Sequence, residues 1–300
     1  MPHDTYQSYH RFNAITFDTS SCRDDYRARL NVMTKDLQSL APDILLLQNV
    51  FATADNRYNT AAHLARRLGM QCAFLPLRPK LRHLDGRPTQ SHSGLAILSR
   101  HAIVSASHIE LPCDPRDGQR IAQFCDIELQ GTHLLVANIQ LGHRAGTDAA
   151  RRHQIEKLAE CLAGAHDFDH ILAGGDFNAG RIEPALDPIR NLAGFAVAEA
   201  APERGVDRLF AISRTPGYRP VAPIVLSESR TELDAADSAT NLYPGDRPAL
   251  ACELTLTAVR PAHVFPVGDH PIWAHTPHFG QFGGQSAAKS RISALQTAAE

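Results

Sequence analysis

The sequence predicts an α+β fold in which two β-sheets pack face to face and helices cover their outer sides. Three observations lead to this prediction. Segments of strand length, either apolar or alternating, outnumber the segments with helical spacing. The helical segments occur singly between strands and not in a run. The two halves of the chain contain a similar mixture of both kinds of segment.

The individual elements follow from hydrophobic spacing and from the glycines and prolines between them. Helical spacing predicts helices at residues 26–40, 59–68, 147–162 and 184–192, and a weakly held one at 286–300. Strands are predicted at residues 10–18, 44–47, 95–98, 103–111, 121–129, 132–141, 171–174, 206–212, 221–226 and 250–256. The stretch 75–90 is basic and contains several prolines, so we expect a loop there.

A β-α-β unit opens the chain. Helix 26–40 has apolar residues such as Leu30 and Leu37 on one face, and Pro42 follows its end. The apolar strand 44–47 comes next. Because a helix connects them, strands 10–18 and 44–47 are expected to be neighbours in one sheet.

The composition is that of an ordinary globular protein. The 300 residues are 43% hydrophobic and 21% charged, and the formal net charge is -2. This balance differs from a strongly basic nucleic-acid-binding chain, although it allows a local basic patch. No apolar run is long enough to cross a membrane, and the polar N-terminal residues do not form a signal peptide. The six cysteines have no close spacing, so we expect them to be reduced and mostly buried in a cytoplasmic protein.

The stretch 171–179 (ILAGGDFNA) is the first candidate for a functional site. An apolar strand reaches two glycines and then a turn that contains Asp176 and Asn178. These two side chains are expected on the same side of the chain. A carboxylate and an amide at a strand end suit a hard cation or a phosphate. An ordinary turn stabilised by the aspartate side chain is the alternative.

Further motifs occur in a fixed order along the chain. They are 42–50 (PDILLLQNV), 93–100 (SGLAILSR), 138–141 (NIQL), 151–154 (RRHQ), 175–178 (GDFN), 206–210 (VDRLF) and 245–248 (GDRP). Together they resemble the endonuclease/exonuclease/phosphatase superfamily, which includes DNase I and exonuclease-III-like enzymes. The resemblance implies a four-layer α/β/β/α sandwich, with a domain at 1–257 and a partly flexible C-terminal extension at 258–300.

The resemblance also implies a reaction and a cofactor. Members of the superfamily hydrolyse phosphate esters, and Mg²⁺ or Mn²⁺ would stabilise the charge that develops. By resemblance, Asp176 would orient or deprotonate the attacking water, and Asn178 would donate to a phosphate oxygen.

The metal-binding motif departs from the family pattern. Asn49 stands where the family has a glutamate, and a neutral amide is a weaker ligand for a hard cation. The family has an asparagine at the end of the first strand, where this chain has Asp18. The metal ligands would then be Asp18 and Asn49, with carboxylate and amide exchanged. Asn13 is a rival for the first-strand position, and Asp18 could instead only cap the following turn.

The groups that would contact phosphate are also altered. Gln140 replaces the family histidine, and it can donate a hydrogen bond but carries no charge. It could equally be a polar residue that simply closes a strand. His143 lies three residues further on and is an alternative donor, although it is expected in a loop.

The last motif lacks its histidine. Anchored on Pro248, the family's Asp-His pair becomes Gly245-Asp246, whereas a one-residue gap keeps the aspartate as Asp246; in either alignment no histidine is present. By resemblance Asp246 would keep a catalytic role and Arg247 would contact phosphate. Asp207, which would orient the lost histidine, is expected to pair with Arg247 or Arg208 in a structural ion pair. His270, in a Gly-Asp-His-Pro segment of the extension, either folds back into the cleft or lies in a proline-bounded turn.

The basic stretch from Arg78 to Arg87 has two interpretations. In a nuclease such a segment could contact phosphates. In a slightly acidic chain it could equally be a solvated surface loop.

Two functional hypotheses remain. The first is a pseudoenzyme or very weak hydrolase whose cleft binds a phosphate-ester ligand or a protein partner. The second is an active Mg²⁺-dependent phosphodiesterase or phosphatase with rearranged ligands. The altered residues at 49, 140 and 246 favour the first, because catalytic groups that act as a unit lose most of their effect together. A nucleic-acid partner is left open.

Overall fold

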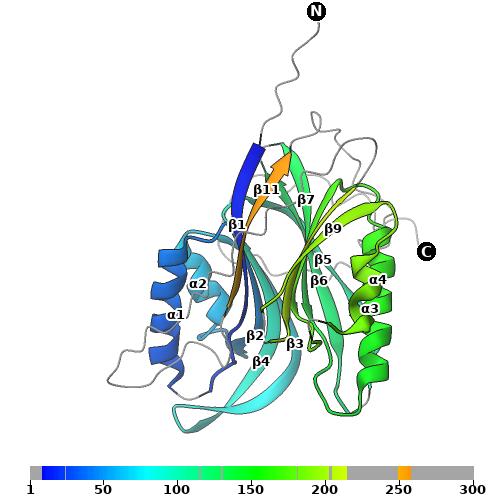
Figure 1. Ribbon diagram of the computed structural model, residues 1–300. Helices are drawn as coiled ribbons and strands as arrows, with labels where there is room; N and C mark the ends of the chain where they lie inside the picture. Colours follow the sequence, from blue (N-terminus) through cyan, green and yellow to red (C-terminus); the bar gives the residue numbers. More distant parts are fainter. Residues whose placement is uncertain are drawn as a thin grey trace, which may run out of the picture.

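A computed structural model describes residues 9–23, 25–114, 116–129, 131–180, 182–202, 205–214 and 249–257. In this part of the chain two β-sheets face each other and helices cover both outer sides, so the molecule is a four-layer α/β/β/α sandwich (Figure 1). The predicted fold is therefore confirmed. The expected strand 221–226, the extension 258–300 and residues Asp246, Arg247 and His270 lie outside the described residues.

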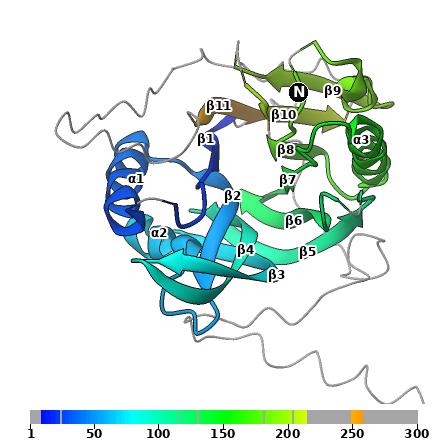
Figure 2. The ribbon, with the colours of Figure 1, turned by 90° about the horizontal axis from the view of Figure 1, so that it is seen from below.

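The first sheet has the strand order β11-β1-β2-β4-β3. Its strands are β1 (Tyr9–Asp18), β2 (Ile44–Thr53), β3 (Gln71–Leu84), β4 (Arg87–Ser99) and β11 (Leu250–Thr257). Strand β1 is parallel to β2, as the β-α-β unit predicts, whereas the other neighbours are antiparallel. Helices α1 (Tyr26–Leu40) and α2 (Thr60–Leu68) cover its outer face (Figure 2).

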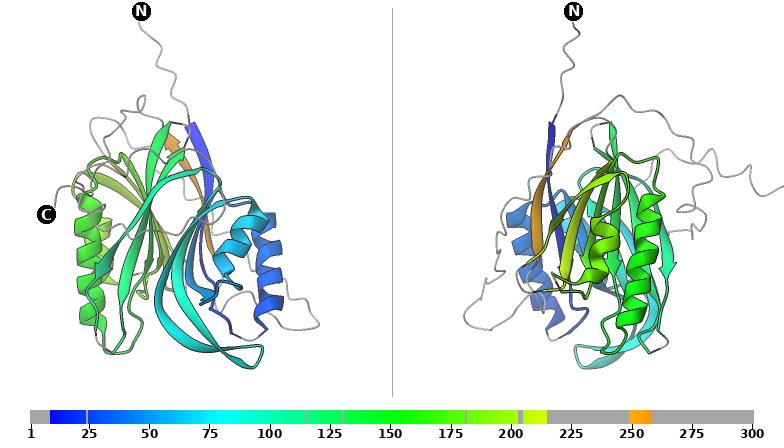
Figure 3. Two further views of the ribbon diagram at one scale, coloured as in Figure 1. Left: turned by 180° about the vertical axis from the view of Figure 1, so that it is seen from behind. Right: turned by 45° about the vertical axis from the view of Figure 1, so that its right-hand side comes forward.

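The second sheet has the order β5-β6-β7-β8-β10-β9. Its strands are β5 (Ala102–Leu111), β6 (Arg120–Leu129), β7 (Thr132–Gln140), β8 (His170–Asp176), β9 (Phe195–Ala200) and β10 (Asp207–Arg214). The long helix α3 (Asp148–Ala163), the single turn η1 (Pro184–Leu186) and the short helix α4 (Asp187–Arg190) lie on its outer side. Figure 3 shows the same layers from behind.

The helix ends follow from local chemistry. In α1 the Asp25 side chain accepts a hydrogen bond from the backbone of Ala28, and Ala41 closes the helix in the left-handed conformation. In α2 Asn59 accepts in the same way from Ala62, and Gly69 closes the helix. The apolar faces of both helices are buried against the first sheet, so the predicted amphipathic pattern places them there.

The central core lies between the two sheets. It contains Phe12, Ile44 and Leu46 from the first sheet and Val136 and Leu172 from the second. Burial of side chains of this size contributes about 1.5–3 kcal/mol each. This apolar layer fixes the position of one sheet relative to the other. The strand ends at its border are therefore held in a constant arrangement.

Two expectations for the strands are corrected. Residues 75–90 are not a loop, because β3 and β4 form a long hairpin that extends at the lower end of Figure 1. The prolines misled the prediction: Pro76 and Pro79 flank a register shift, and β3 is an edge strand of its sheet. Proline is tolerated at both kinds of place. Strand β9 was not expected at all, and it pairs with β10 at the sheet edge.

No helix in the described part of the chain is long and apolar enough to cross a membrane. All six cysteines are free, as predicted. Cys22, Cys125 and Cys252 are buried, whereas Cys161 is half-buried and the other two are exposed, so the expectation that most are buried is not met.

Candidate functional site

The bulge in the middle of β2 and the end of β7 lie close together across the two sheets. Gln48, near the bulge in β2, donates a hydrogen bond to Asn138 of β7 (Nε2 to Oδ1, 2.7 Å). Leu95, opposite the bulge, and Ile121, beside the end of β7, belong to one small apolar cluster. The chain positions that follow, 49 in the first sheet and 140 in the second, are therefore near each other.

Three predicted site residues form a row across the second sheet. In the strand register Asp176 pairs with Gln140 of β7 on one side and with Asp207 of β10 on the other. Register partners in a sheet point to the same face. Asp176 and Asp207 are buried, and Gln140 is half-buried. The structure thus brings together three residues that are far apart in sequence.

The turn after β8 is tightly constrained. The backbone of Asn178 donates to Oδ1 of Asp176 (3.1 Å), and Asn178 has a positive φ of 49°. Its side-chain amide donates to the carbonyl of Leu141 (3.1 Å). At Gly175, which has a φ of 137°, a Cβ atom would collide with the carbonyl oxygen of Ile139. The GDFN segment is therefore both an aspartate-stabilised turn and a rigid platform beside the end of β7.

Arg208 supports this turn from inside the protein. Its side chain is fully buried and donates to the carbonyl of Ala179 (2.5 Å) and to that of Asp207 (2.7 Å). Glu199 lies 3.3 Å from its Nε atom and also binds Arg190. Arg208 thus takes part in a buried, structural ion pair with Glu199. The expected pairing of Asp207 with Arg208 or Arg247 stays a prediction.

Asp18 and Asn49 touch each other. The Asn49 amide donates to Oδ2 of Asp18 (2.8 Å), and the backbone of Ser20 donates to Oδ1 (2.8 Å). Asn49 has a positive φ of 51° within the β2 bulge. Asp18 therefore both caps the following turn and meets Asn49. Asn13 pairs with Glu253 within the strand and is remote from this end.

Helix α1 fixes the segment after Asp18. Arg29 is buried and donates to the carbonyls of Thr19 (2.7 Å) and Arg23 (3.0 Å). The Thr19 hydroxyl in turn donates to the carbonyl of Asn49 (3.0 Å). Hydrogen bonds from a charged guanidinium, such as those of Arg29, are stronger than neutral ones. Arg29 and Thr19 therefore fix the backbone next to the Asp18–Asn49 pair.

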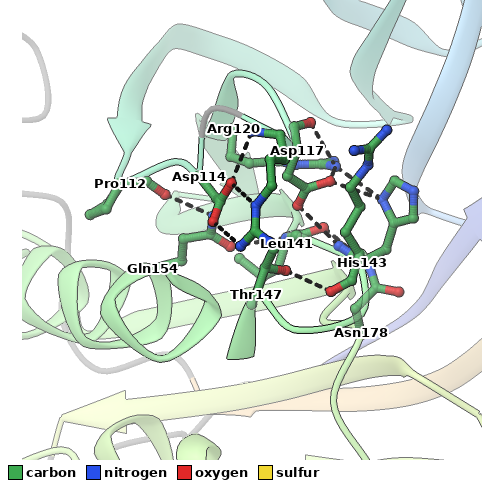
Figure 4. A network of polar contacts seen from close by, with 12 residues as sticks. Pro112, Asp114, Asp117, Arg120, Leu141, His143, Thr147, Gln154 and Asn178 are labelled. Atoms are coloured by element: carbon green, nitrogen blue, oxygen red, sulfur yellow. Dashed lines mark hydrogen bonds and ion pairs between the residues drawn. The ribbon is translucent and has the colours of Figure 1, made fainter. Parts of the chain in front are cut away.

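A further polar network lies beside the turn, and its composition was not predicted (Figure 4). Asp117, whose side chain is 2% exposed, accepts from Arg120 (2.8 Å) and from the backbone of His143 (3.1 Å). An Arg120 nitrogen lies 3.0 Å from Nδ1 of His143. The His143 side chain is 64% exposed. A signal did exist: pairing of Ala122 with Ile139 in the hairpin brings Arg120 next to the chain that follows β7.

The RxxQ motif explains how this network is held. Gln154 accepts from the backbone of Gly142 (2.9 Å) and donates to the carbonyl of Pro112 (2.7 Å). Arg151 binds Asp148 (2.6 Å) and Glu183. Helix α3 therefore joins the loops on both sides of Asp117, so this motif has a structural role.

The basic hairpin contributes cations at the same place. Arg78 packs against Gly118, where its guanidinium would block any added side chain. Burial, with the charges of Arg82, Arg78 and Arg120, lowers the pKa of Lys80. The Arg82 guanidinium donates hydrogen bonds to Ser91 and to Ser93 within the hairpin.

Comparison with known proteins identifies the family to which this fold belongs. A family model described as "Endonuclease/Exonuclease/phosphatase family" matches residues 15–277. The chain belongs to the endonuclease/exonuclease/phosphatase family. A search of curated proteins gives no match. The match extends beyond Thr257 into the stretch that we predicted to be an extension.

Solved structures of family members share the fold. The human Nocturnin catalytic domain with bound sulfate anion is 18% identical, with a TM-score of 0.58 over 84% of this chain and 98% of that one. A family protein from Bacteroides thetaiotaomicron is 16% identical, with a TM-score of 0.60 over 86% and 100%. One from Beutenbergia cavernae is 17% identical, with a TM-score of 0.59 over 82% and 72%.

The family reaction implies a divalent cation, and the described donor set fits one poorly. The Asp18–Asn49 pair offers one carboxylate, that of Asp18. Both oxygens of this carboxylate already accept hydrogen bonds. Among the residues that the structure describes, no three histidine, cysteine, aspartate or glutamate side chains could together hold a metal ion. Tight Mg²⁺ sites combine carboxylates with near-ideal octahedral geometry.

Proposed function

We propose that this family member binds a phosphate-ester ligand at the ends of β7 and β8 and hydrolyses it weakly or not at all. The observation that carries the proposal is the hydrogen bond from Asn49 to Asp18. In that arrangement the Asn49 amide stands in place of a metal-binding carboxylate. Its N–H group also occupies an oxygen of Asp18, the one carboxylate that is left in the pair. The affinity for Mg²⁺ would fall, and with it the charge stabilisation that phosphoryl transfer needs.

The other side of the site keeps the features of an anion-binding surface. Gln140 and Asn178 present amides at neighbouring strand ends. Arg78 and Lys80 add cations from the hairpin, close to Gly118 and to Arg120. Amide and guanidinium donors recognise phosphate oxygens without any need for a metal. These residues support retention of a phosphate ligand even where hydrolysis is lost.

An active phosphodiesterase or phosphatase is the second candidate. The intact GDFN turn supports it, together with the exchange at Asp18 and Asn49, which would still supply one carboxylate and one amide. In this case Asp176, in the row with Gln140 and Asp207, would orient the attacking water.

One experiment separates the two candidates. Purified protein is assayed with a nitrophenyl phosphodiester, a phosphomonoester and DNA in the presence of Mg²⁺ or Mn²⁺. Inorganic phosphate binding is measured in parallel by calorimetry. We expect phosphate binding that Asn178→Ala weakens, with no turnover above background. Metal-dependent turnover that Asp176→Ala abolishes would instead establish the active enzyme. An absence of phosphate binding would refute the proposed cleft.

A further inference from the structure

The polar network around Asp117 lies beside the turn that contains Asn178. His143 follows β7 by three residues, and Asn178 binds the carbonyl of Leu141 within the same loop. In Figure 4 His143 and Asn178 lie at one edge of the network, and Pro112 and Gln154 lie at the opposite edge. An imidazole is therefore held next to the turn where the ligand is expected, although the motif position itself is Gln140.

The contacts determine how the His143 ring can act. An Arg120 nitrogen lies 3.0 Å from Nδ1, whereas the nearest Asp117 oxygen lies 3.5 Å from it. Arginine only donates, so the shorter contact assigns Nδ1 as the acceptor and places the proton of the neutral ring on Nε2. Asp117 balances the charge of Arg120 at 2.8 Å. With Nδ1 occupied, Nε2–H remains as the donor of a side chain that is 64% exposed.

We propose that His143 donates from Nε2 to a phosphate oxygen of the ligand bound at Asn178, and so supplies the imidazole missing at position 140. Asp117 and Arg120 are positioning residues, because they fix the ring and its tautomer without touching the ligand. This inference rests on the proposed phosphate-binding function. It adds a recognition group that comes from the loop after β7 and not from the strand itself.

The network is built for positioning. Asp117 is almost fully buried and accepts from the Arg120 side chain and the His143 backbone. A methyl group at Gly142 would collide with the Asp117 carboxylate, so the loop approaches it closely. Gln154 holds the backbone of Gly142 from helix α3. The exposed imidazole is therefore attached to a rigid base, which lowers the entropic cost of a contact with a ligand.

The test follows imidazole and amide resonances of the full-length, ¹⁵N-labelled chain while inorganic phosphate is added. His143→Gln and Asn178→Ala assign the two side chains. We expect phosphate to shift the Nε2 resonance of His143 with the same dissociation constant as the Asn178 amide. We also expect His143→Gln to weaken phosphate binding about tenfold, because the glutamine amide lacks the contact with Arg120 that fixes the Nε2–H donor of the imidazole. The control His153→Gln, which changes an exposed residue of α3, should bind phosphate normally.

Asp117→Ala tests the positioning role. We expect the His143 resonances to move toward those of a ring with mixed tautomers, and phosphate binding to weaken together with that change. A purely structural role would lower the melting temperature and leave the tautomer signature unchanged.

The possible failures can be told apart. If phosphate shifts Asn178 but neither His143 nor the affinity of His143→Gln responds, this inference is wrong and the proposed cleft stands. If phosphate shifts neither side chain, both proposals fail.

Discussion

The buried amide of Gln48 donates to Oδ1 of Asn138 at 2.7 Å and joins the two sheets directly behind the site. Asn138 in turn donates to the carbonyls of Leu47 (2.9 Å) and Ala96 (3.0 Å). Thr16 completes the set, because its hydroxyl accepts from Gln48 (3.0 Å). A fully satisfied buried network of this kind makes a single packing arrangement of the two sheets favourable.

Removal of Asn138 should therefore destabilise the protein. We expect Asn138→Ala to lower the free energy of unfolding by about 2–4 kcal/mol, since several buried polar groups lose their partner. Urea denaturation measures this change. The double variant Gln48→Leu/Asn138→Leu should lose less than the sum of its single variants, because the two residues interact. Simple additivity would show that they do not act together.

Gly175 should not tolerate a side chain. Gly175 has a φ of 137°, and the Ile139 carbonyl lies where a Cβ atom would be, so Gly175→Ala should lower the free energy of unfolding by about 2–4 kcal/mol. Gly180, a few residues on, has no atom near its Cβ position, so Gly180→Ala is the matched control and should be close to neutral. Equal melting temperatures of the two variants in thermal denaturation would contradict the tight approach of β7 to this turn.

Asn49→Glu should restore a site for a cation. Without metal, the new carboxylate lies beside Asp18 in place of a hydrogen bond, and we expect a loss of about 1–3 kcal/mol. Saturating Mn²⁺ should then raise the melting temperature by about 5–10 °C. Asn49→Gln, which adds length without charge, should show no such increase. An increase of the same size in the wild-type protein would mean that its own donor set already holds the metal.

Tyr26 should make the stability sensitive to alkaline pH. Burial raises the pKa of its phenol to about 12, although Thr60 offers a hydrogen bond. Because the folded-state pKa is higher than the unfolded one, the neutral phenol stabilises the fold below pH 10, and this contribution is lost as the pH rises to about 12. The loss is about 1.4 kcal/mol per pH unit in that interval.

Denaturation of the wild-type protein and Tyr26→Phe between pH 9 and about pH 12 measures this effect. The phenylalanine variant should lose less stability over the interval, whereas the control Tyr58→Phe should follow the wild type. Parallel curves for wild type and Tyr26→Phe would mean that the phenol is accessible to hydroxide.

Most of the fold could be predicted from local patterns, whereas much of the site could not. Helix α1 matches its expected range because apolar spacing and Pro42 mark it clearly. The β3–β4 hairpin was missed because its prolines, taken by themselves, indicate a loop. Only the strand order of the sheet shows that β3 is an edge strand, where proline is tolerated. Strand pairing also decides the site: Asp176 and Asp207 become neighbours only through the register of β8 and β10.

The network around His143 shows the same limit. Asp117 comes from a loop, Arg120 from the start of β6 and His143 from the loop after β7. Apart from the strand pairing that links Arg120 with the chain after β7, nothing in their spacing marks the three residues as a group. The pairing of the hairpin strands brings the last two together, and Gln154 of α3 binds the backbone of Gly142 and Pro112 on the loops around Asp117. Local sequence could identify the motifs but not the contacts between them.

The prolines of the β3–β4 hairpin have one more consequence. Pro76 and Pro79 have no backbone N–H, and Arg78 and Lys80 place positive charges along the same outer strand. A second polypeptide that tried to lengthen the sheet along β3 would meet missing donors and repelling cations. The prolines and basic residues that made this segment resemble a loop therefore also protect the edge strand β3 from edge-to-edge aggregation.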